Sequence, residues 1–130
     1  MASHVRVPAS ALAATTEARS GANVSTRSRG HTSMANTVVA VADSDRALIL
    51  REAGHAPVHY FPPEDVAFAL LEPTDHTSWC PYKGEADYHS IPAGGERSTN
   101  AAWRYREAFP AVAAIAGYVA FYRDRVDISG

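Results

Sequence analysis

The apolar runs of this chain are short, and a turn signal follows almost every one of them. Acidic turn residues 43–46 follow the run 38–41, and a Pro-Ala-Gly-Gly segment follows the run 85–91. Pro62 and Pro63 must end the run 58–61, because proline cannot donate a hydrogen bond to a neighbouring strand. Such runs predict short strands. We expect about seven strands, at residues 38–41, 47–51, 58–61, 85–91, 101–105, 118–122 and 126–128, the first two forming a hairpin.

Two segments have the pattern of short helices. Pro63 suits a first helical position, and the apolar residues of the segment 64–71 recur at helical spacing. Pro110 begins a second helix that runs to Ile115, and Gly117 ends it. Strands and helices together predict a single β-rich domain of the α+β class.

Residues 1–33 differ in composition from the rest. They are rich in Ala, Ser, Thr and Arg, contain no aromatic residue and have no helical or strand periodicity. We expect a disordered extension that takes no part in the core, with a domain at 34–130. The extension is either a segment upstream of the natural start, with Met34 as the true first residue, or an organelle-targeting leader.

Charge and cysteine content exclude several classes of protein. Residues 34–130 hold eight basic and thirteen acidic side chains, so we expect no nucleic-acid partner. The single cysteine, Cys80, excludes an internal disulfide and zinc knuckles with paired cysteines. No apolar run is long enough for a membrane span. We therefore expect a cytoplasmic protein without a membrane partner.

The densest chemistry lies in the segment 80–88, which combines a thiol, an amine and two phenols. Pro81 favours an extended Cys80, and Gly84 permits a positive φ before the next strand. Cys80 is either a nucleophile activated by a nearby cation or a small buried apolar residue. Lys83, the only lysine of the chain, is either a polar anchor or amine base in a pocket or a solvated loop residue.

Acidic and aromatic residues near this segment add further candidates. Glu85 and Asp87 share a strand face about 7 Å apart, which suits either paired-carboxylate chemistry or a hydrated outer face. Cys80, Lys83 and Glu85 are thus the candidate catalytic residues. Aromatic residues either form a pocket wall or pack in the core. The candidate ligand-binding residues are Tyr60, Tyr82, Lys83, Tyr88, Trp103 and Tyr105.

Metal binding receives little support from the sequence. His55 and His59 are separated by Pro57, which forbids a helix, and in a strand they would lie about 13 Å apart. The acidic pair Asp43 and Asp45 lies where a hairpin turn requires such residues. We expect no metal site and no cofactor.

Five ordered motifs show a resemblance to a known family. They are Tyr60-Phe61-Pro62-Pro63-Glu64-Asp65-Val66, Leu71-Glu72-Pro73-Thr74, Cys80-Pro81-Tyr82-Lys83-Gly84, Ala102-Trp103-Arg104-Tyr105 and Ile115-Ala116-Gly117-Tyr118-Val119-Ala120-Phe121-Tyr122. Together they resemble the DUF427 family over nearly all of residues 36–128. The resemblance implies a Mss4-like, or β-tent, fold, without the four zinc-binding cysteines of many proteins of that fold. The family's function is unknown, although it sometimes carries a nucleotidyltransferase label.

Three functional hypotheses follow. The first is a pocket that binds a small molecule of unknown identity, with Lys83 as its polar anchor. The second is an enzyme, such as a nucleotidyltransferase, that uses Lys83 with Glu85 or with the pair Asp43 and Asp45. The third is a non-catalytic protein-interaction module, which a solid aromatic core without a cavity would favour.

Overall fold

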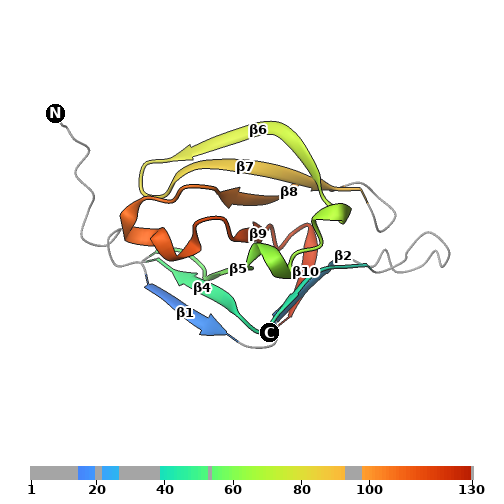
Figure 1. Cartoon of the computed structure of the whole chain (residues 1–130), viewed down its shortest axis with the longest axis horizontal. Coiled ribbons are helices and arrows are strands. Elements are labelled where there is room, and N and C mark those ends of the chain that lie inside the picture. The colour runs from blue at the N-terminus through green and yellow to red at the C-terminus, as the bar shows by residue number, and fades with distance from the viewer. Residues whose placement is uncertain (1–14, 20–21, 27–38, 53, 93–97, 130) are drawn as a thin grey trace.

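The computed structural model describes residues 15–19, 22–26, 39–52, 54–92 and 98–129. Three antiparallel sheets account for the strands in these residues (Figure 1). The first sheet has the order β1 (Thr15–Arg19), β4 (Ala47–Arg51), β5 (Val58–Tyr60); the second has the order β10 (Val126–Ser129), β2 (Ala22–Thr26), β3 (Ala40–Ser44); the third has the order β6 (Glu72–Cys80), β7 (Gly84–Ile91), β8 (Ser98–Tyr105), β9 (Val119–Phe121).

The four-stranded sheet covers the two smaller sheets (Figure 1). Phe61, which directly follows β5, exchanges two backbone hydrogen bonds with Val119 of β9, at 2.8 and 2.9 Å. This bridge joins the β1–β4–β5 sheet to the edge of the four-stranded sheet. Tyr60 at the end of β5 also lies close to Trp103 of β8, with ring centroids 6.3 Å apart.

The alternation of strand side chains decides which residues of the four-stranded sheet face inward. Tyr88 of β7 pairs with Trp103 of β8, and Ala86 pairs with Tyr105, so these residues share one face. Asp87 pairs with Arg104 and lies on the opposite face. The strand at 85–91, its partner at 101–105 and the shared face of Trp103 and Tyr105 are as the sequence predicted.

Two groups of buried side chains form the core. One group lies between the four-stranded sheet and the β10–β2–β3 sheet, and includes Val24, Val41, Phe61, Ile91 and Phe121. The other lies between the four-stranded sheet and the β1–β4–β5 sheet, and includes Leu50, Tyr60, Tyr105, Ile115 and Ala120. The second group forms the base of the pocket described below.

The α+β class that we predicted, with about seven strands and two helices, is wrong, because the described residues form three antiparallel sheets and no α-helix. In the described residues both predicted helices are short 3-10 turns: η1 (Pro63–Asp65) and η2 (Phe68–Leu70) replace the first, and η3 (Pro110–Ile115) the second. Val66 is already extended, and its neighbour Ala67 donates to the carbonyl of Val41. In the first segment, this hydrogen bond to β3 outweighs the helical spacing. In the second segment, Val112 has a non-helical φ of −130°, which interrupts η3.

Two further expectations differ from the structure. β1 and β2 lie within residues 1–33, and Ala22 and Val24 of β2 are fully buried, so the expected absence from the core is wrong for β2. The other residues of that segment lie outside the described ranges, and the boundary at Met34 stays a prediction. The predicted hairpin of residues 38–51 is also wrong, because β3 pairs with β2 whereas β4 pairs with β1.

No helix in the described part of the chain is long and apolar enough to cross a membrane.

Candidate functional site

The turn between β6 and β7 fixes the backbone of Lys83. Cys80 pairs with Gly84 at the end of the two strands, and the amide of Lys83 donates to the carbonyl of Cys80 at 3.2 Å. The carbonyl of Lys83 accepts a hydrogen bond from Phe109, at 3.0 Å. Gly84 has a φ of +117°, and a Cβ there would lie 3.1 Å from the carbonyl oxygen of Glu107. Only glycine combines this φ with so close a backbone contact.

The Lys83 side chain is largely buried and paired. Its Nζ lies 2.9 Å from Oε1 of Glu52, and the two side chains are only 15% and 13% exposed. Glu52 directly follows β4, so the ion pair connects the β6–β7 turn to the β1–β4–β5 sheet. Such a pair presents a donor and an acceptor side by side at a net charge of zero.

Aromatic rings line the space beside this pair. The Trp103 indole stands perpendicular to the Tyr60 ring, with centroids 6.3 Å apart, and its Nε1 donates to the Tyr60 hydroxyl at 3.4 Å. The Tyr122 ring lies against the Trp103 ring, with centroids 4.5 Å apart, and is stacked on the Tyr88 ring, with centroids 6.5 Å apart. The Tyr88 hydroxyl lies 2.9 Å from Oγ of Ser78 and 3.3 Å from the Tyr122 hydroxyl. These contacts hold the rings in one arrangement.

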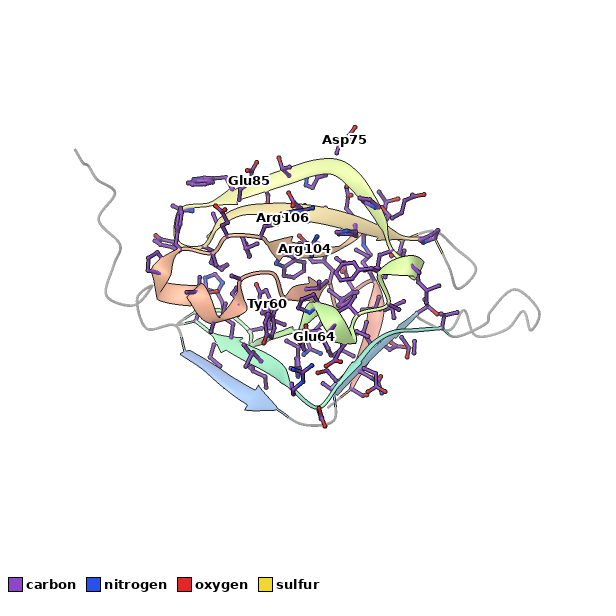
Figure 2. The ribbon with its side chains drawn as sticks, in the orientation of Figure 1. Tyr60, Glu64, Asp75, Glu85, Arg104 and Arg106 are labelled. Atoms are coloured by element: carbon purple, nitrogen blue, oxygen red, sulfur yellow. The ribbon has the colours of Figure 1, made fainter. Side chains whose placement is uncertain are left out.

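A pocket of about 290 Å³ lies between these groups. Figure 2 shows Tyr60 between β9 and β4, whereas Glu85 lies beside β6 and β7. The pocket thus opens between two sheets that come from distant parts of the sequence. It is lined by Glu52, His55, Ala56, Val58, Tyr60, Lys83, Tyr88, Trp103, Tyr105 and Tyr122.

Three phenols of the pocket, those of Tyr60, Tyr105 and Tyr122, stay protonated at neutral pH. Burial raises the pKa of Tyr60 and Tyr105 above the ordinary tyrosine value of 10. Burial, together with the hydrogen bond with Tyr88, raises the pKa of Tyr122 to about 12. Neutral hydroxyl groups of this kind can donate or accept a hydrogen bond but supply no base at pH 7.

The model of the family described as "Domain of unknown function (DUF427)" matches residues 25–129. The chain belongs to this family. No curated protein matches the chain. The match to the DUF427 family begins within β2 and reaches the last strand, β10, so it includes every strand that contributes to the pocket.

Most of the residues that the sequence suggested for a pocket lie together in this DUF427 domain. Five of the six line the cavity: Tyr60, Lys83, Tyr88, Trp103 and Tyr105. Tyr82, in the turn beside Lys83, does not line it. Cys80 is half-buried and packs against the core beneath the pocket without lining it. Whether these residues bind a ligand stays a prediction.

Sequence reasoning missed five residues of the pocket lining: Glu52, His55, Ala56, Val58 and Tyr122. Tyr122 is the last residue of an apolar run, and no local pattern distinguished it from its neighbours in that run as a pocket residue. Glu52 lies 31 positions before its partner Lys83, and nothing in the local pattern indicates that pairing. Only the contact between the sheets reveals both.

The arrangements that nucleotidyl transfer would need are not assembled around Lys83. Glu85 lies on the opposite face of β7 from the pocket and lines a different cleft. Asp43 and Asp45 line a third cleft with Asp65, whose carboxylate accepts a hydrogen bond from Ser44 at 2.6 Å. In the ranges that the structure describes, no three His, Cys, Asp or Glu side chains are grouped to hold a metal ion.

Proposed function

We propose that this DUF427 domain binds a small, partly apolar molecule between the rings of Tyr60, Tyr88, Trp103 and Tyr122. The observation that carries the proposal is the meeting of the chain's only lysine with these rings around one cavity of about 290 Å³. Small-molecule sites are typically concave, mostly apolar and equipped with a few fixed polar groups. The pocket is concave and has fixed polar groups in Lys83 and Glu52, and its lining is about equally polar and apolar.

The Lys83–Glu52 pair indicates the chemistry of the ligand. An anionic ligand would gain the attraction of Lys83 but would suffer the repulsion of Glu52, and a cationic ligand would meet the reverse. A neutral group with an acceptor next to a donor, such as an amide or a ring lactam, satisfies both partners without leaving a charge unpaired. We therefore propose a neutral planar ring that carries such a group.

Three fragments of similar size and different charge test this proposal: benzamide, benzoate and benzylamine. Ligand-observed NMR should rank benzamide first. Lys83→Met and Glu52→Gln should each weaken benzamide binding, because each removes one side of the paired donor and acceptor. Glu85→Gln is the matched control, since it makes the same chemical change on the opposite face of β7 and should leave binding unchanged.

Two results would refute the proposal. One is that Lys83→Met binds every fragment as tightly as the wild type does. The other is an equal loss in Glu52→Gln and Glu85→Gln, which would locate the fragments elsewhere. Isothermal titration with Mg²⁺ and a panel of nucleotides separates this function from nucleotidyl transfer. We expect no binding of any nucleotide in the panel, whereas a nucleotidyltransferase would bind at least one.

A further inference from the structure

The outer face of the four-stranded sheet carries a second aromatic cleft, formed by Trp79 and Phe109. Trp79 is 65% exposed and Phe109 is 37% exposed. Their ring centroids lie 5.5 Å apart, and the ring planes meet at 77°. The two rings are thus in edge-to-face contact, and both line one cleft while staying partly exposed to solvent.

The backbones of Trp79 and Phe109 are both fixed by neighbouring segments. Trp79 belongs to β6 and pairs in register with Glu85 of β7. The amide of Phe109 donates to the carbonyl of Lys83, and its carbonyl accepts from Val112 at 2.9 Å. The ring pair is thus built from the same turn that positions Lys83 on the other side of the sheet.

The cleft that the two rings line has an excess of negative charge. It has a volume of about 380 Å³ and is lined by three carboxylates, of Glu85, Asp87 and Glu107, against one guanidinium, of Arg106. Arg106 is bound to Asp87 through its Nε. Among the residues that the structure describes, Glu85 and Glu107 form no ion pair, so two carboxylates remain for an incoming cation. Figure 2 shows Glu85 and Arg106 beside β7.

We propose that this cleft binds a small organic cation, an alkylated ammonium compound. The electron-rich faces of Trp and Phe attract a cation that is only weakly hydrated, and nearby carboxylates add a long-range attraction. A metal ion fits less well, because the rings would replace none of its oxygen ligands. The volume is in the range of small-molecule sites. This site is separate from the pocket at Lys83 and does not depend on its function.

NMR of the labelled protein with tetramethylammonium chloride tests the site directly. The chain has two tryptophans, so its spectrum contains two indole N–H signals, and Trp103→Phe assigns the remaining one to Trp79. Tetramethylammonium should move the Trp79 signal in a saturable manner and should leave the Trp103 signal in place. Sodium chloride at equal concentration controls for ionic strength, and neopentyl alcohol, a neutral molecule of similar shape, controls for apolar contact.

Substitutions separate the two contributions. Because Phe109 remains as a partner, Trp79→Ala should weaken binding about 3- to 30-fold, as measured on the Phe109 amide signal. Glu85→Gln combined with Glu107→Gln should weaken binding and reduce its dependence on salt. Equal binding of neopentyl alcohol, a shift of Trp103 instead of Trp79, or shifts that sodium chloride reproduces would each overturn the proposal.

Discussion

Breaking the Lys83–Glu52 pair offers the sharpest test of the pocket's architecture. With side chains that are 15% and 13% exposed, the pair lies between two measured limits. Exposed ion pairs contribute about 0–1 kcal/mol, whereas removal of one partner from a fully buried pair costs about 3–5 kcal/mol. We expect Lys83→Met to lower the free energy of unfolding by about 2 kcal/mol, because Glu52 keeps its charge without its partner.

A double-mutant cycle separates the interaction from the other effects of each substitution. Lys83→Met should cost less than about 1 kcal/mol in a Glu52→Gln background, which gives a coupling energy of about 1–2 kcal/mol. Urea unfolding followed by tryptophan fluorescence supplies the four free energies. The exposed pair Arg46–Glu64, with side chains 55% and 59% exposed, is the matched control. A coupling energy at Lys83–Glu52 no larger than that of the control would refute the reasoning.

Three further predictions concern the backbone, pH and the phenols. Gly84→Ala should lower the free energy of unfolding by at least about 1 kcal/mol more than Gly54→Ala. Both glycines have a positive φ, but only at Gly84 would a Cβ also come close to a backbone carbonyl oxygen. Urea unfolding of the two variants measures the difference. Burial, reinforced by two nearby arginines, lowers the pKa of His89. Because the unfolded chain binds the proton better, the contribution of neutral His89 to stability should be complete above pH 6.5 and should fall as the pH drops below it. His89→Leu should therefore lose less melting temperature than the wild type between pH 7.5 and 5.5. At pH 10, where an ordinary tyrosine is half ionised, Tyr122→Phe should have the same tyrosinate absorbance as the wild type, because Tyr122 ionises near pH 12; a clear loss of absorbance would contradict the assigned environment.

Local signals succeeded where the local backbone decides the outcome. β5 ends at Tyr60, shortly before the proline pair that begins at Pro62, and Gly84 adopts the positive φ that its sequence context suggested, since proline and glycine each restrict or free their own backbone. The period of two placed Trp103 and Tyr105 on one face of β8, because alternation is a property of any strand. The helical spacing of 64–71 failed, because hydrogen bonding to β3 competes with the helix and a segment this short has little helical stability of its own.

The sequence by itself determined the family, the strand-rich character of residues 85–128 and five of the residues around the pocket. Each depends on motifs or on neighbours a few positions apart. The tertiary structure alone decided that β3 and β4 join different sheets, that Glu52 pairs with Lys83 and that Glu85 lines a different cleft from Tyr60. These results depend on contacts between distant segments, whose energy comes from burial in the assembled sheets and leaves no trace in the local order of residues.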